Sequence, residues 1–126
     1  MDPLRRELRQ TADGLVHRLA RVGVELRYDR EGVVALDEYV EANRELWSPD
    51  DRRRLAVELA AFIGECMVET YGLPWRDAAD GGAVIALPGG KVADPLRGAV
   101  ARLDGAERLA ACFDSVGAEL AGSRTD

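Results

Sequence analysis

Glu65 is the residue of this chain whose setting most suggests chemistry. It follows Gly64 in the middle of an apolar segment, and on a helix Glu58 and Glu69 would share its side, two turns before it and one turn after it. Clustered carboxylates can bind a metal ion or act as acid and base. No histidine or further aspartate stands at matching spacing on a second element, so the sequence predicts no metal ligand, no cofactor and no catalytic residue.

Three interpretations of Glu65 are open from the sequence. The carboxylates could form a solvated acidic face of an amphipathic helix. Glu65 could instead be partly buried and pair with Arg76 or Arg97, which would attach a hairpin to the helix. The third interpretation is a ligand-binding pocket between helix and hairpin, formed by Glu65, Glu69, Trp75 and Arg76.

Two other motifs resemble functional sites without their defining spacing. His17 is the single histidine, and no serine or cysteine nucleophile with an orienting carboxylate accompanies it, so we expect a surface position. The segment Pro88-Gly89-Gly90-Lys91 lacks the spacing of a phosphate-binding loop and leads into Val92, not into a helix. We expect a hairpin turn there.

The charge balance restricts the class of partner. The chain has 17 Lys and Arg against 23 Asp and Glu, a net charge of −6, which disfavours broad binding to DNA or RNA. Arg5, Arg6, Arg9 and Arg52–Arg54 would have to converge on one face to overcome this. The Arg52–Arg54 run is either a solvated face or a docking patch for an anionic surface.

The remaining composition indicates a cytoplasmic bacterial protein. No apolar run approaches the roughly 18 residues of a membrane span, and the N-terminal residues lack the apolar region of a signal peptide. Cys66 and Cys112 are isolated within apolar helical patterns and are expected to be reduced core thiols. Abundant Ala, Gly, Arg and Asp with a single lysine, Lys91, suggest a GC-rich bacterial genome.

The first predicted helix begins at Asp2-Pro3, where aspartate can cap and proline needs no donor, and it ends at Gly23. Leu8, Leu15 and Val22 recur every seven residues on its apolar stripe. We expect this stripe either to pack internally or to form an interaction surface, including one for a homodimer.

The apolar residues of the next segments change between the two-residue period of a strand and the 3.6-residue period of a helix. Residues 24–28 alternate strictly and predict a half-buried strand, and 29–32 predict a turn. A helix follows over 33–47, and Ser48 with Asp51 forms a capping box for a long central helix over 49–71. Gly64 within this helix costs about 1 kcal/mol relative to alanine, so we expect close packing by the hairpin there.

The second half predicts a small meander followed by two helices. Its three short strands are expected at 73–77, 83–87 and 91–93, with glycine turns between them. Asp94-Pro95 starts a helix to about Leu103, and Asp104 to Glu107 resembles a capping box for the last helix. The sequence therefore predicts one α+β domain over residues 1–121, with about five helices on an antiparallel sheet of three or four strands, and a flexible tail over 122–126.

Several short motifs together resemble a family of small bacterial domains of unknown function. They span about Val24 to Val116, three quarters of the chain. They are Leu36-Asp37-Glu38-Tyr39-Val40, Gly64-Glu65, Gly72-Leu73-Pro74-Trp75, Leu87-Pro88-Gly89-Gly90, Asp94-Pro95 and Phe113-Asp114. The family has no established reaction, so the resemblance supports the α+β fold and leaves the function open.

These features favour a non-enzymatic interaction or regulatory domain, of the adaptor or immunity type, whose partner is another protein or a second copy of the chain. Nucleic acid and membrane partners are not expected. The alternative is a small-molecule-binding protein or an enzyme that uses Glu65 in a pocket between helix and hairpin.

Overall fold

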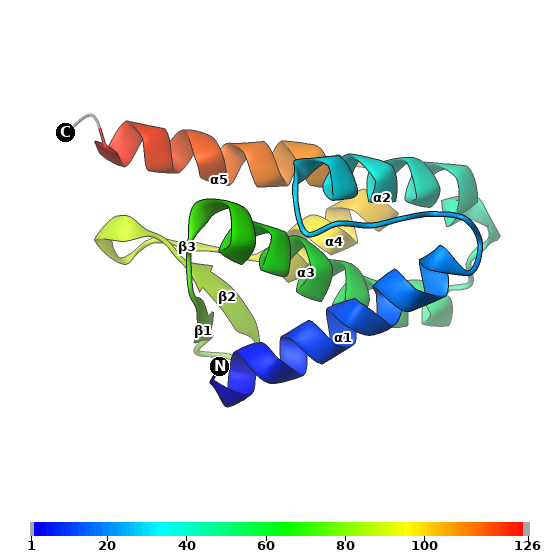
Figure 1. Cartoon of the computed structure of the whole chain (residues 1–126), viewed down its shortest axis with the longest axis horizontal. Helices are drawn as coiled ribbons and strands as arrows, with labels where there is room; N and C mark the ends of the chain where they lie inside the picture. The colour runs from blue at the N-terminus through cyan, green and yellow to red at the C-terminus, as the bar shows by residue number, and fades with distance from the viewer. Residues whose placement is uncertain (1, 125–126) are drawn as a thin grey trace.

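The computed structural model describes residues 2–124, and the side chains of residues 2–122. Within that range the chain forms five α-helices and three strands (Figure 1). The helices are α1 (Pro3–Ala20), α2 (Arg30–Asn43), α3 (Pro49–Tyr71), α4 (Pro95–Leu103) and α5 (Leu109–Arg124). The strands are β1 (Trp75–Asp77), β2 (Ala83–Ala86) and β3 (Val92–Ala93), with short 3-10 turns η1 (Arg44–Leu46) and η2 (Pro88–Gly90). The predicted α+β class is confirmed.

Three helices begin where local capping chemistry predicts. The Asp2 side chain accepts a hydrogen bond from the backbone N–H of Arg5. Ser48 and Asp51 form the reciprocal capping box at the start of α3. Asp94 accepts from two backbone N–H groups of the first turn of α4. In each case proline occupies the first helical position, where its missing N–H costs nothing.

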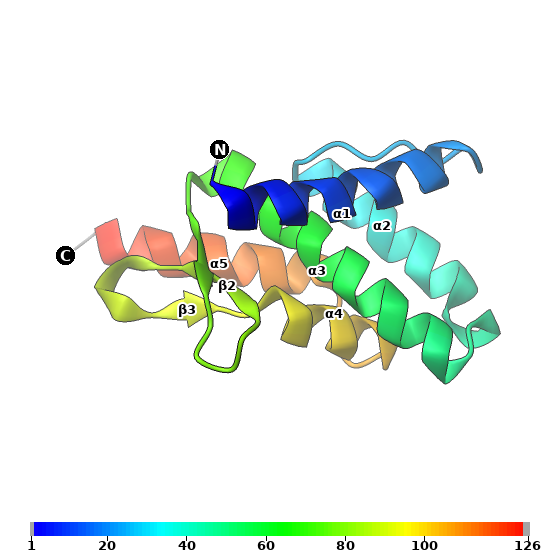
Figure 2. The same ribbon diagram turned by 90° about the horizontal axis from the view of Figure 1, so that it is seen from below.

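Helix α3 is the centre of the molecule, as its apolar pattern predicts. Residues 61–67 are all buried, so this stretch is covered on every side. Helix α1 packs along one side of α3, while α4 and α5 contact it elsewhere (Figures 1 and 2). Left-handed Gly72 (φ 70°) then ends the helix and turns the chain toward the sheet.

The sheet is an antiparallel meander in the order β1-β2-β3. Trp75 pairs with Ile85, and Ala86 pairs with Val92. The sheet lies beside the N-terminal end of α1 (Figure 1). Ile85 of the middle strand is fully buried, and β2 packs against α3. The hairpin is therefore placed next to the middle and end of α3, where Gly64 and Glu65 lie.

The predicted strand over residues 24–28 is wrong. These residues run as an irregular segment, and no strand among residues 2–124 pairs with them. Their apolar members instead pack on helices: Leu26 is 7% exposed, and the Tyr28 ring lies 5.3 Å from that of Phe62 in α3. The alternation is real, but helices and not a neighbouring strand cover its apolar side.

The expected turn at 29–32 is instead the first turn of α2. The Asp29 side chain caps the helix by accepting from the backbone N–H of Gly32. A Cβ atom at Gly32 would lie 1.8 Å from the carbonyl oxygen of Arg27. Glycine is thus required because the incoming segment passes directly over the start of α2.

The predicted start of the last helix at Asp104–Glu107 is also wrong. Helix α5 begins at Leu109, and its first N–H groups are capped by a residue far away in the sequence. The buried carboxylate of Asp37 in α2 accepts from the backbone N–H of Leu109 at 2.7 Å and of Ala110 at 2.9 Å. Arg102 of α4 lies against the same carboxylate, its Nε atom 3.2 Å from Oδ1.

The far end of α5 runs further than expected. The helix continues through Arg124, so residues 122–124 of the predicted tail are helical. Leu120, 7% exposed, keeps the last turns packed on the core. Residues 125 and 126 of that tail lie outside the described residues.

Asp37→Ala should therefore destabilise the fold strongly. Removal of this carboxylate leaves the buried Arg102 with only the half-exposed Glu41 as an ion-pair partner and the start of α5 uncapped, which costs about 3 kcal/mol in the free energy of unfolding. Urea unfolding followed by circular dichroism measures the loss. Asp104→Ala is the matched control and should change the free energy by less than about 0.5 kcal/mol. An equal loss in both variants would contradict the assignment of Asp37 as the cap.

Candidate functional site

Glu65 is fully buried, and its carboxylate is surrounded by donors from two other elements. Nη1 of Arg9 donates to Oε1 at 3.1 Å, and Nε of Arg5 lies 3.5 Å from Oε2. The indole N–H of Trp75 donates to Oε2 at 2.8 Å. Two of the three interpretations are therefore wrong: Glu65 is not solvated, because it is buried, and it does not pair with Arg76 or Arg97, because α1 supplies the arginines.

The other two carboxylates on this side of α3 also pair with α1. Glu69 accepts from Nη2 of Arg5 at 2.9 Å and from Nη1 of Arg9 at 3.1 Å. Glu58 accepts from both terminal nitrogens of Arg18, one of them at 2.9 Å. Because α1 runs antiparallel to α3, the three arginines meet the three glutamates in reverse order. The acidic stripe is therefore the α1-binding side of α3.

Tyr28 extends this cluster toward the segment between α1 and α2. The guanidinium of Arg9 lies 3.7 Å from the centre of the Tyr28 ring, a cation–π contact. The Tyr28 hydroxyl donates to Asp13 of α1. Burial, together with this hydrogen bond, raises the pKa of the Tyr28 phenol.

Gly64 makes room for the indole of Trp75. A Cβ atom at this position would lie 2.0 Å from Cη2 of Trp75, so alanine could not be accommodated without displacement of the ring. The hairpin thus packs closely on the mid-helix glycine, as we expect from the sequence. The indole then covers Glu65, which excludes water from the carboxylate.

The four predicted ligand-binding residues do not form one site. Glu65, Glu69 and Trp75 meet around the two arginines, but Arg76 is exposed on β1 and makes no hydrogen bond or ion pair with them. A hollow of about 220 Å³ does lie between α3 and the hairpin. Trp75 lines it and Glu65 does not, so the buried carboxylate attaches α1 and the hairpin to α3 and does not face this hollow.

The three residues of the predicted interaction stripe on α1 also lie in different environments. Leu15 is fully buried in the core, and Leu8 is half-buried against it. Val22, in the turn after α1, is 64% exposed. Because α1 packs on α3, its apolar stripe is mostly interior, and of these three residues only Val22 is largely exposed.

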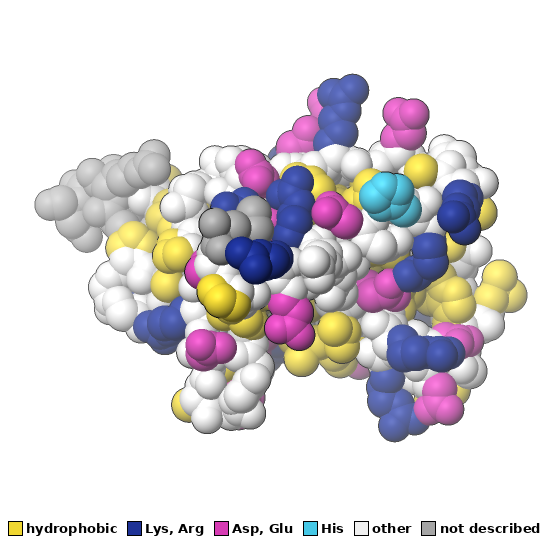
Figure 3. Space-filling view, turned by 60° about the horizontal axis from the view of Figure 1, so that its bottom comes forward, with side chains coloured by type: hydrophobic (Ala, Val, Ile, Leu, Met, Phe, Trp, Pro, Cys, Tyr) yellow, Lys and Arg dark blue, Asp and Glu magenta, His cyan; other side chains and the backbone are white. Residues whose placement is uncertain are grey.

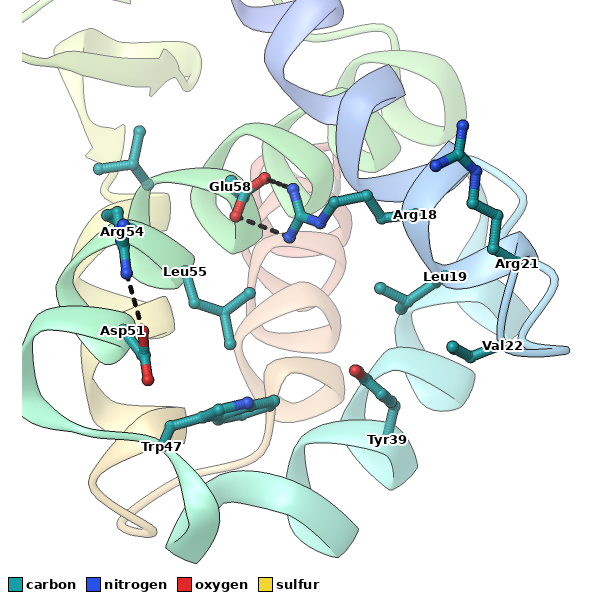
Figure 4. A pocket seen from close by; sticks show the side chains of 11 residues that line it. Arg18, Leu19, Arg21, Val22, Tyr39, Trp47, Asp51, Arg54, Leu55 and Glu58 are labelled. Carbon is teal, nitrogen blue, oxygen red and sulfur yellow. Dashed lines mark hydrogen bonds and ion pairs between the residues drawn. The ribbon is translucent and has the colours of Figure 1, made fainter.

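Val22 lines a groove of about 1040 Å³ that the sequence does not predict (Figure 4). Its apolar walls come from the end of α1, from α2, from the residue after η1 and from the start of α3. The residues are Leu19, Val22, Tyr39, Trp47, Leu55 and Val57. The one sequence signal is Val57, an apolar residue that falls outside the buried stripe of α3 and is 54% exposed.

Charged residues surround the groove, and most are already paired. Arg18 forms its ion pair with Glu58 across one edge, and Arg54 pairs with Asp51 at another (Figure 4). Arg21 also lines the groove and makes no ion pair with any described residue.

The Arg52–Arg54 run, for which the sequence leaves open a solvated face or a docking patch, finds its partners largely within the chain. Arg53 and Arg54 pair with Asp50 and Asp51, one turn earlier in α3. Arg52 donates to the backbone carbonyl of Arg44 at 2.7 Å. Cations at a helix N-terminus are unfavourable because of the helix dipole. Here carboxylates and a carbonyl of the same chain compensate for them, so no external anion is required.

Comparison with known proteins assigns no function. No family model, no curated protein and no solved structure matches the chain. Among the described residues, no three His, Cys, Asp or Glu side chains are grouped so that they could hold a metal ion. None of the described helices is both long enough and apolar enough to cross a membrane.

Glu65→Ala should be far more destabilising than Glu69→Ala. The first change leaves Arg5 and Arg9 facing a buried, empty position and the Trp75 indole N–H without its acceptor, at a cost of about 3 kcal/mol. Glu69 is half-exposed, and its loss should cost less than about 1 kcal/mol. Urea unfolding of both variants measures the difference. Equal, small losses would contradict the structural role of Glu65.

Proposed function

We propose that this chain is a cytoplasmic, non-enzymatic interaction domain that binds a partner protein in the groove between α1, α2 and α3. The observation that carries this proposal is the position of its exposed apolar side chains. Val22 and Val57 line the groove, and Leu46, 80% exposed, directly precedes its wall residue Trp47.

Exposed apolar surface of this kind indicates an interaction site. Each Å² of apolar surface kept in water forgoes about 25 cal/mol of stabilisation. Contiguous apolar patches with polar rims mark binding surfaces in monomeric proteins. Figure 3 shows apolar side chains exposed in several places on one face of the molecule, with basic and acidic side chains between them. Leu46 does not line the groove, so a small molecule inside the groove would leave this side chain uncovered, and a protein surface is the better occupant.

Other features support the cytoplasmic and regulatory parts of the proposal. Cys66 and Cys112 are both free thiols, the first buried and the second half-buried, which suits a reducing compartment. Burial raises the pKa of both thiols, so neither is activated as a nucleophile. The same proposal includes an adaptor or immunity-type role in a bacterium. It also includes membership of the family of small bacterial domains that the motifs resemble.

A small-molecule-binding role is the second candidate, and one observation favours it. The hollow of about 220 Å³ beside Trp75 is lined mainly by apolar groups, including Leu8, Val84 and Leu96. Glu65 would act there only through Trp75. A metabolite found bound to the purified protein would favour this candidate over the protein-binding one.

The double variant Val22→Asp, Val57→Asp should lose the partner while it keeps the fold. Both side chains are exposed, so the changes add no buried charge to the free protein, but each would place an unpaired carboxylate in an apolar interface. Native mass spectrometry of the protein purified gently from its own host identifies whatever remains bound. We expect one defined partner with the wild type and none with the double variant.

The matched control is Val92→Asp, Val100→Asp. Both valines are exposed to a similar degree, neither lines the groove, and the charge change is identical. This control should retain the partner, and circular dichroism should show equal helix content in all three proteins. Retention of the partner by the groove variant, or a wild type that is always a bare monomer, would contradict the proposal.

A further inference from the structure

The walls of the groove restrict the backbone conformation of its occupant. They are built from α1, α2 and α3 together with Trp47, and no residue of β1, β2 or β3 lines them. The backbone groups of the wall helices already bond within their own helices, so an extended peptide would find no strand edge to pair with. A segment that enters the groove must satisfy its own backbone hydrogen bonds, and a helix does so.

A second depression shares one wall residue of α3 with the groove. Val57 lines both the groove and the smaller hollow beside the hairpin, whose other α3 residues are Ala60 and Ala61. The span from Leu55 to Ala61 corresponds to about 9 Å along the α3 axis. Two turns of a bound helix rise about 10.5 Å. Two apolar side chains seven residues apart on such a helix can therefore occupy the two depressions, one on each side of Val57.

The charge around the groove indicates which polar groups the partner carries. Glu58 and Asp51 are neutralised by Arg18 and Arg54, so Arg21 is the lining charge without an ion pair among the described residues. Figure 4 shows Arg21 extending from the same end of α1 as Val22. The lining holds three arginines (Arg18, Arg21 and Arg54) against two carboxylates (Asp51 and Glu58), so its net charge is 3 − 2 = +1, although the whole chain carries −6. A carboxylate on the partner would complement it.

We infer that the groove binds an amphipathic helix of a partner protein, with two apolar anchors about two turns apart on either side of Val57 and a carboxylate facing Arg21. This inference rests on the proposed function and adds the chemistry of the partner. It predicts that the groove prefers acidic peptides and that this charge preference can be reversed, because Arg21 is exposed and can be changed without disturbance of the core.

The test is a selection from a displayed library of random peptides of about 16 residues, roughly 24 Å as a helix. The bait is the full chain, as wild type, Arg21→Gln or Arg21→Glu. We expect wild-type selections to be enriched in apolar residues seven apart with neighbouring Asp or Glu. The acidic preference should fade with Arg21→Gln and turn to Lys and Arg with Arg21→Glu, while the apolar spacing stays.

Affinities of the selected peptides then locate the contact. Arg21→Glu should weaken an acidic peptide about fivefold, and Val57→Asp should weaken it by more than about tenfold. Val100→Asp should leave it unchanged. Enriched sequences without helical spacing, or an acidic preference that Arg21→Glu does not alter, would overturn the inference, as would a selection that yields no binder.

These outcomes are distinct from failure of the proposed function itself. If a partner still co-purifies and depends on Val22 and Val57, but the peptide selections show no helical or acidic preference, the groove binds a surface of another kind. If no partner depends on those valines and no peptide is enriched, both proposals fail together.

Discussion

A carboxylate that is fully removed from water is stable only where charged and hydrogen-bonding partners replace the solvent. Glu65 meets this requirement in the middle of α3 with partners from two separate parts of the chain, Arg5 and Arg9 of α1 and the Trp75 indole of β1. The same contacts therefore position the first helix and the hairpin on the central helix. Gly64 is part of the arrangement, because only a residue without a side chain admits the indole.

A second buried polar centre does the same for the other half of the molecule. Asp37 of α2 joins Arg102 of α4 to the first N–H groups of α5. A buried apolar side chain can pack against apolar groups of any neighbouring helix. Each of these buried polar groups, in contrast, has a specific partner. Between α1 and α3 the paired arginines and glutamates end at Arg18 and Glu58, which border the groove (Figure 4). The exposed apolar surface thus lies at the end of this series of ion pairs.

The features that could be predicted from the sequence are those with local causes. Asp2, Ser48 and Asp94 each cap a helix within three residues of their own position, and the apolar stripe of α3 identifies it as central. The errors arise where a distant segment supplies the contact. Residues 24–28 have the pattern of a strand but are covered by helices, and α5 takes its cap from a residue more than seventy positions earlier. Glu65 could be identified as unusual, but its arginine partners depend on how α1 packs. The groove combines residues of several elements, so no single motif encodes it.

The two tryptophans lie in separate environments, and this has a consequence for spectroscopy. Trp75 is hydrogen-bonded to a buried carboxylate and lies against Gly64, whereas Trp47 packs on Tyr39 in the wall of the groove. Indole emission depends on local polarity and on nearby quenching groups. The intrinsic fluorescence of this protein therefore combines two independent signals. Trp75 reports whether the first helix and the hairpin are seated on α3, and Trp47 reports what occupies the groove.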